Sequence, residues 1–159
     1  ELSESLQIIP FSTDELALVL PTNHPLAKSK ELTKEDLYSL GFITLDTQST
    51  TRKVLDKLLS SSGLDVQRLH IEMELNSLEA IKNAVQANLG AAFLPVVSIE
   101  RELLGGSLHR PIVADLVVKR ELKVITNPGR YSSRAAEAFT KDILPLFASS
   151  ELPALGAEG

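Results

Sequence analysis

The chain has 159 residues, a formal net charge of −5 and 43% apolar residues, enough for one sizeable core or two small ones. No apolar run approaches the roughly 20 residues that cross a bilayer, so we expect no membrane contact. The acidic balance argues against a segment that grips nucleic acid by itself. Because the chain contains no cysteine, disulfide scaffolds and thiolate chemistry are excluded. A chain that opens at Glu1, with no signal-peptide pattern, is expected to be an intracellular piece of a longer protein.

Hydrophobic periodicity predicts an alternation of strands and helices. Apolar runs and period-two alternation predict strands, whereas apolar residues three or four positions apart predict helices. In chain order we expect a strand at 15–20, a short helix at 33–40, a strand at 42–45, a helix from about 50 to 62, an alternating strand at 68–75, a helix at 77–89, a strand at 91–94, a helix at 97–104, a strand at 117–125 and a final helix from 133 to 144. Thr33 and Asp36 have the spacing of a capping box at the first of these helices.

This alternation predicts an α/β fold with parallel strands covered on both faces. In open sheets of that kind, ligands lie beyond the carboxyl ends of the strands, against helix N-termini.

The first polar junction between a strand and a helix is rich in side chains that can form hydrogen bonds, namely Thr47, Gln48, Ser49 and Thr50. The first-turn N–H groups of the following helix have no partner within the helix, and the helix macrodipole is positive at that end. Together they predict a site for a small anion. The alternative is an ordinary N-cap in a polar turn.

A second junction of the same kind contains Asn76 and Ser77. Because the carboxyl ends of parallel strands share one edge of a sheet, we expect the two junctions to lie on a common rim. Gly90 is expected to bring backbone close to the same region.

Residues suited to catalysis or metal binding do not form a recognisable pattern. His24, His70 and His109 are far apart in the chain, and Glu72 and Glu74 occupy one solvated strand face. The sequence also has no nucleophile elbow, Walker loop or dinucleotide fingerprint. We therefore expect no enzyme activity, no metal and no cofactor.

Several segments resemble the effector-binding domain of LysR-type transcriptional regulators. Residues 15–27 resemble that family's crossover strand and following turn, and residues 76–95 resemble its next landmark. A narrower resemblance, to the RuBisCO-operon regulators of cyanobacteria and plastids, rests on residues 45–50, 71–77 and 127–139. The family likeness covers residues 6 to 147.

The resemblance implies a two-lobed fold of the type II periplasmic-binding-protein kind, with an effector between the lobes. Residues 13–126 would be a largely complete second lobe, and residues 1–12 and 127–148 would be remnants of a truncated first lobe and of the crossover. Residues 149–159 would form a flexible tail. The N-terminal helix-turn-helix domain would be absent, and apolar surface would be exposed where the first lobe is missing.

The resemblance also assigns residue roles. Thr47, Gln48, Ser49 and Thr50 match the cap that faces the effector, with Asn76 and Ser77 beside it. Phe93 or Pro95 would border the cleft, and core packing is the equal alternative for Phe93. Arg52 is either a charge partner of the effector or a solvated helix residue.

The implied function is metabolite sensing by a LysR-type DNA-binding regulator of carbon-fixation (RuBisCO) genes. The effector would be a small anionic metabolite, either a sugar phosphate or a 2-oxo acid. DNA would be bound through the missing domain, the protein would form dimers or tetramers, and it would reside in the cytoplasm or plastid stroma. The alternative is a solute-binding protein of the same fold that serves transport.

Overall fold

The computed structural model describes residues 6–129 and 132–145, so the predicted tail from Ser149 lies outside the described residues. The chain divides into two compact units, one formed by residues 14–120 and the other by residues 1–13 and 121–159. The first unit carries both polar junctions that the sequence singles out. Among the described residues, no helix combines the length and the apolar character that a membrane crossing requires.

The strands of the structure are arranged differently from the predicted all-parallel sheet. Strand β2 (Gly41–Leu45) pairs in parallel with β3 (His70–Leu75), as predicted. Strand β1 (Gln7–Pro21), however, runs antiparallel to both β4 (Ala92–Pro95) and β5 (Leu108–His109), and it also pairs with β6 (Val118–Thr126). The expectation of parallel strands throughout is therefore wrong for β1. The apolar run at 15–20 predicts a buried strand but carries no information on its direction.

A short bridge joins the parallel pair to the antiparallel strands. Ile43 N–H donates to Ala91 O at 2.8 Å, and Ala91 N–H donates to Gly41 O at 2.8 Å. The bridged residues are Phe42 and Ala91, in parallel orientation. The first residues of β2 are thereby tied to the residue that precedes β4, the strand that carries Phe93.

Four α-helices belong to the unit of residues 14–120: α1 (Lys34–Leu37), α2 (Thr50–Ser61), α3 (Leu78–Gln86) and α4 (Glu100–Leu104). Short 3-10 helices cover Pro25–Lys28, Val66–Arg68 and Val96–Ser98. The predicted capping box is confirmed, because Asp36 N–H donates to Thr33 Oγ1 at 3.2 Å and Thr33 N–H donates to Asp36 Oδ2 at 2.7 Å. The predicted helix after it ends at Leu37, three residues earlier than expected.

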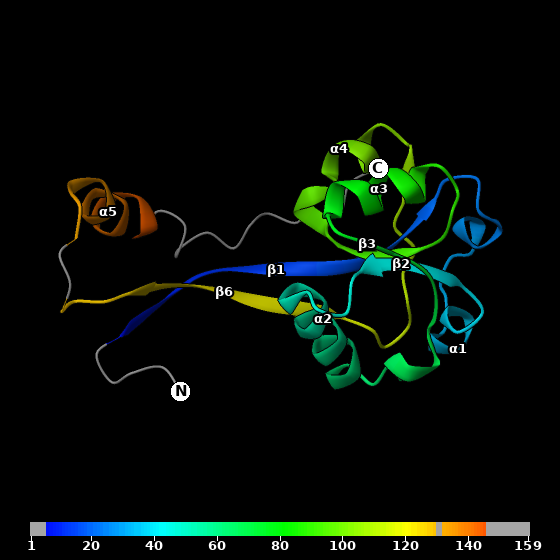
Figure 1. The fold of residues 1–159 in the computed structure, drawn as a ribbon. Coiled ribbons are helices and arrows are strands. Elements are labelled where there is room, and N and C mark those ends of the chain that lie inside the picture. Colours follow the sequence, from blue (N-terminus) through cyan, green and yellow to red (C-terminus); the bar gives the residue numbers. More distant parts are fainter. Residues whose placement is uncertain (1–5, 130–131, 146–159) are drawn as a thin grey trace. The chain divides into compact units, whose positions relative to one another are not determined.

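Helices α2 and α3 lie on opposite sides of the β2–β3 pair (Figure 1). The core accordingly forms two clusters. Leu18 and Leu20 of β1 pack with Leu59 of α2, whereas Val19 packs with Ile81 of α3. Successive residues of β1 point to opposite faces, so this strand is buried on both sides. Its continuous apolar run follows from that burial.

Strand β3 is less buried than its alternating sequence predicts. Met73 is 36% exposed, and the pairing register shifts between Phe42 and Ile43. Such a shift is typical of a bulge, which displaces the side-chain alternation locally.

The described part of the other unit contains α5 (Arg134–Ala138), which continues into a π-helical turn at Phe139–Ile143. Ser133 caps this helix, since Ala136 N–H donates to its hydroxyl at 3.2 Å. Large apolar side chains are exposed here, namely Ile8, Leu122, Ile125, Phe139 and Ile143.

An ion-pair cluster joins α3 to α4. Lys82 Nζ lies 2.9 Å from Glu79 Oε2 and 2.9 Å from Glu102 Oε1. The hydrogen bond from Lys82 lowers the pKa of Glu102 below its ordinary value of 4.5. The same two carboxylates raise the pKa of Lys82.

This cluster predicts a loss of stability in acid. Because the folded pKa of Glu102 lies below the unfolded value, its contribution is complete above pH 4.5 and is lost as the pH falls through the folded pKa. We expect Glu102→Gln to have a shallower fall in melting temperature between about pH 5 and pH 3 than the unaltered chain. Glu100→Gln, on the same helix, is the control, since Glu100 forms no ion pair within the described residues. Parallel melting curves for all three proteins would contradict the prediction.

Candidate functional site

The two polar junctions lie side by side at one edge of the β2–β3 pair. Leu45 and Leu75, the last residues of these strands, are register partners, and Asp46 N–H donates to Leu75 O at 3.2 Å. Ser49 and Ser77 then cap the two following helices. The common rim that the sequence predicts is present.

The backbone donors at the start of α2 are already partly used. Asp46 Oδ1 accepts hydrogen bonds from Gln48 N–H at 2.9 Å and from Ser49 N–H at 3.1 Å. Ser49 Oγ accepts from Arg52 N–H at 3.4 Å. The amides of Thr50 and Thr51 are therefore the first-turn donors left for a ligand among the described residues. The Asp46 carboxylate also places a negative charge beside them, which the sequence-based argument overlooked.

The start of α3 is similar. Ser77 Oγ accepts from Ala80 N–H at 3.1 Å, which leaves the amides of Leu78 and Glu79. The predicted site residues around both caps are exposed to solvent: Thr47, Gln48, Thr50, Asn76 and Ser77. Ser49 is half-buried. A ligand can reach this rim without displacing core side chains.

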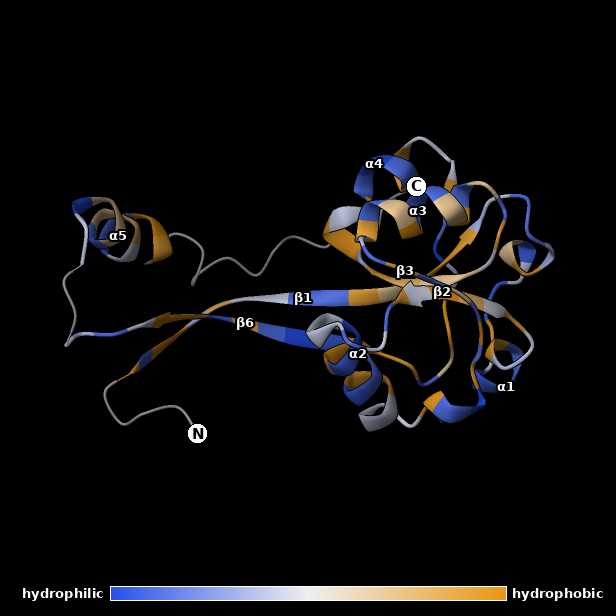
Figure 2. Ribbon diagram, in the orientation of Figure 1, coloured by the Kyte–Doolittle hydropathy of each residue, from blue (hydrophilic) through white to orange (hydrophobic). Residues whose placement is uncertain are grey.

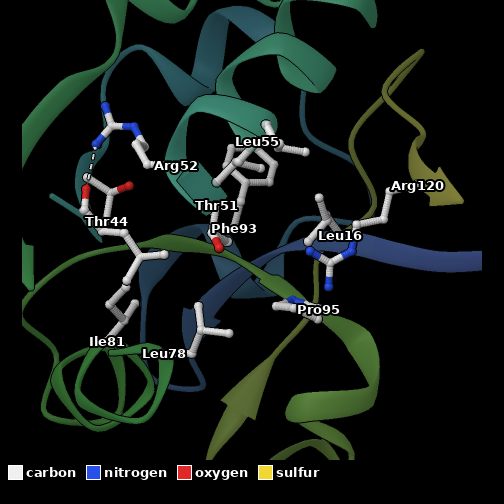
Figure 3. Close-up of a pocket in the computed structure, with 12 residues that line it drawn as sticks. Leu16, Thr44, Thr51, Arg52, Leu55, Leu78, Ile81, Phe93, Pro95 and Arg120 are labelled. Atoms are coloured by element: carbon white, nitrogen blue, oxygen red, sulfur yellow. Dashed lines mark hydrogen bonds between the residues drawn. The ribbon is translucent and has the colours of Figure 1, made fainter. Parts of the chain in front are cut away.

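A hollow open to solvent lies next to the rim and is drawn in Figure 3. Its wall includes Thr44 from β2, Thr51 from α2 and Leu78 from α3, as well as Leu16, Phe93, Pro95, Arg52 and Arg120. Of the predicted site residues, Phe93, Pro95 and Arg52 line it; Thr47, Gln48, Ser49, Thr50, Asn76 and Ser77 lie on the neighbouring rim. The hollow thus begins at the first turns of both capped helices.

Phe93 serves both alternatives that the sequence left open. It is 7% exposed, and its ring stacks on Phe42 with the centroids 5.7 Å apart and the planes nearly parallel. The same side chain forms part of the wall of the hollow. Phe93 is therefore a core residue with an edge that a ligand can touch.

Arg52 is neither a solvated residue nor a free cation. Its Nε donates to both oxygens of Asp56, at 2.8 and 2.9 Å, and its Nη1 donates to Leu45 O at 3.0 Å, the bond dashed in Figure 3. Glu74 Oε1 lies 3.9 Å from the same Nη1. Arg52 thus ties α2 to the end of β2, and its charge is compensated within the protein.

Sequence reasoning missed a second arginine in the wall, Arg120. It pairs with Asp14, which is 5% exposed. A signal was present in the sequence, because Arg120 is two positions from the buried Val118 and shares its side of β6. A charged residue at an inward-facing strand position is expected to have a specific partner, because burial of an unpaired charge is costly.

Within residues 6–129 and 132–145, no three His, Asp or Glu side chains are grouped closely enough to hold a metal ion.

The sequence model of the LysR substrate-binding domain matches residues 1–146 of this chain. The chain belongs to that family. Among curated proteins it is 58% identical to the "Probable RuBisCO transcriptional regulator" of Trichormus variabilis over 151 residues, which are 95% of this chain and 45% of that protein. It is 54% identical to the protein of the same name from Synechocystis sp., over 94% of this chain and 43% of that protein. The LysR-family chain therefore spans about half the length of the curated relatives it matches.

Solved structures show the same fold. The Synechocystis CcmR regulatory domain in complex with 2-PG has a TM-score of 0.77 at 23% identity, over 94% of this chain and 70% of that chain. The effector-binding domain of QuiR in complex with shikimate has a TM-score of 0.74 at 21% identity, over 93% of this chain and 68% of that chain. The predicted fold, an α/β effector domain of the type II periplasmic-binding-protein-like kind, is thereby confirmed. The family match favours a regulator over a solute-binding transport protein.

Proposed function

We propose that this chain is the metabolite-sensing part of a LysR-type transcriptional regulator that controls RuBisCO genes. The single observation that carries the proposal is 50–58% identity, over more than nine-tenths of the chain, to relatives named as probable RuBisCO transcriptional regulators. DNA would be bound by a domain outside this chain, and the regulator would act as a dimer or tetramer in the cytoplasm or plastid stroma.

The effector is a small anionic metabolite, either a sugar phosphate or a 2-oxo acid, bound at the rim and the adjoining hollow. Two capped helices present unpaired amides there, and these donors favour anions. The CcmR domain of the same fold was solved with 2-PG. Thr47, Gln48, Ser49, Thr50, Asn76, Ser77 and Phe93 are proposed to form the contacts, within a second lobe that covers residues 13–126.

The effector acts by binding one arrangement of the regulator more tightly than another. A difference of about 1–3 kcal/mol is the usual scale of such coupling. Binding of the full-length protein to DNA upstream of RuBisCO genes should therefore change about 5- to 150-fold when the effector is added.

Metabolite binding is tested by thermal melting of the full-length protein with ribulose bisphosphate, 2-oxoglutarate and 2-PG. At least one should raise the melting temperature, and the rise should grow with the logarithm of the metabolite concentration once that concentration exceeds the dissociation constant. Combined Ser49→Ala and Ser77→Ala replacement is expected to reduce that rise, because both helix starts lose the hydroxyls that order them.

A helix cap elsewhere provides the control. Thr33→Ala removes the cap of α1, which contributes no residue to the rim or the hollow, and should lower the melting temperature without altering the rise caused by the metabolite. If none of the three metabolites produces a rise, the proposal for this effector class is wrong. An unchanged rise in the double variant would exclude the two caps from the site.

A further inference from the structure

Two arginines line the hollow, and Arg120 is the more exposed of them, with 26% of its side chain exposed against 12% for Arg52. Arg52 uses its Nε on Asp56 and its Nη1 on Leu45 O. Arg120, on β6, makes hydrogen bonds only to Asp14 among the described residues. We infer that Arg120 anchors a carboxylate group of the effector in this hollow. The inference rests on the proposed function and names the charged contact of that site.

The geometry of the Asp14–Arg120 pair leaves one edge of the guanidinium open. Arg120 Nε and Nη2 both donate to the same oxygen, Asp14 Oδ2, at 2.9 and 2.6 Å. A guanidinium carries five N–H donors, so Nη1 and the second N–H of Nη2 remain without a partner in the described structure. Two parallel N–H groups on one edge match the two oxygens of a carboxylate.

Asp14 acts as a positioning residue for Arg120. Its side chain is 4% exposed, and its second oxygen, Oδ1, has no hydrogen-bond partner among the described residues. A buried carboxylate that leaves one oxygen unsatisfied is costly for the fold. That cost is explained if Asp14 holds the guanidinium against the wall of the hollow. Figure 2 shows the hydrophilic stretches of β1 and β6 that contain the two residues side by side.

The charges around the hollow favour a carboxylate over a doubly charged phosphate at this end. Arg52 and Arg120 contribute two positive charges, against three carboxylates paired with them, on Asp14, Asp56 and Glu74. A dianion would add twice as much as a monoanion to this excess of negative charge. The remaining wall near Arg120 is apolar, with Leu16, Phe93 and Pro95 (Figure 3). The group bound here is therefore the carboxylate of a metabolite with a short carbon skeleton.

The first test compares variants of the full-length protein by calorimetric titration with 2-oxoglutarate or 2-PG, whichever binds, because each carries a carboxylate. Arg120→Gln is expected to weaken binding about 10- to 100-fold, as befits the loss of a charged hydrogen bond. Because Arg120→Gln leaves Asp14 buried without a partner, the combined Asp14→Asn and Arg120→Gln variant is measured too. The combined variant removes both charges and should fold while binding equally poorly.

A neighbouring ion pair supplies the control. Glu15 pairs with Arg110, and neither residue lines the hollow. Arg110→Gln should change affinity less than about 2-fold, because it removes a half-exposed charge outside the hollow. If the combined Asp14→Asn and Arg120→Gln variant binds a metabolite as the unaltered protein does, the inference about Arg120 is wrong and the proposed function stands.

The second test needs no identified metabolite. Acetate is compared with chloride at equal ionic strength, and we expect acetate to raise the melting temperature by about 3–6 °C at a concentration ten times its dissociation constant. The combined Asp14→Asn and Arg120→Gln variant should show no such rise. Acetate could stabilise only the unaltered protein while all three metabolites fail to bind. In that case the proposed effector class is wrong, and the inference that Arg120 binds a carboxylate is supported. A rise with inorganic phosphate but not with acetate would overturn the carboxylate assignment, and equal rises with acetate in both proteins would overturn the anchor.

Discussion

Replacing Phe93 by Ala is expected to lower the free energy of unfolding by about 3–5 kcal/mol. The side chain is 7% exposed and packs in the cluster that joins β1, β2 and α2. Its removal leaves a cavity and also ends the stacking with Phe42, whose ring centroid is 5.7 Å away. Urea denaturation followed by circular dichroism measures the change. A loss below about 1 kcal/mol would show that Phe93 contributes little to the core.

Substitutions in the stacked pair Phe42 and Phe93 also distinguish an effect on core packing from an effect on metabolite binding. Phe42 is 3% exposed and loses the same stacking when replaced, but it is not part of the hollow beside the rim. We therefore compare Phe93→Leu with Phe42→Leu, which are milder changes that keep the core apolar. Both should lower stability, and only Phe93→Leu should change metabolite affinity directly. If both variants change the metabolite affinity equally, Phe93→Leu alters binding only through the packing of the core.

Replacing Gly90 by Ala should also be strongly destabilising. Gly90 has φ of +157°, and a Cβ there would lie 2.7 Å from Gly41 O and 3.0 Å from Ile43 Cγ1. Gly41 O is the acceptor of the bridge from Ala91 N–H, so the clash falls on the link between β2 and β4. We expect about 1–3 kcal/mol from the backbone conformation and a further 1–3 kcal/mol from the steric overlap.

Gly106 isolates the conformational part of that cost. It has φ of +69°, and a Cβ there would meet no atom within 4 Å. Gly106→Ala should therefore lose only the conformational contribution, about 1–3 kcal/mol. If the two Gly→Ala variants lose the same free energy of unfolding, the close approach of Gly90 to Gly41 does not constrain the fold.

The sequence predicted local structure well where that structure depends on residues close to one another in the chain. The capping box at Thr33 and Asp36 is present, and Ser49, Ser77 and Ser133 cap helices near the positions that periodicity indicated. Each cap depends on residues within three positions of one another. Strand β5, with two residues, and the N-terminal extension of β1 were missed, since their pairing partners lie far away in the sequence.

The candidate site was predicted in outline only. The shared rim follows from two strand ends, Leu45 and Leu75, that are parallel partners. The i,i+4 spacing of Arg52 and Asp56 on the predicted helix was a signal for their ion pair, and it was overlooked. The pairing of Arg120 with Asp14 could not be inferred, because the two residues are 106 positions apart. Asp46 was also overlooked as an acceptor of the amides that an anion would use.

The sequence by itself determined the family, the strand and helix periodicity and the helix caps, because each is recorded in neighbouring residues or in recurring motifs. Only the tertiary structure decided the direction of β1, the bridge from Phe42 to Ala91 and the pairing of Asp14 with Arg120 across 106 positions. Hydrogen bonds and ion pairs between distant residues require the chain to be folded before their partners meet. The charge available to a ligand in the hollow is for that reason a property of the fold.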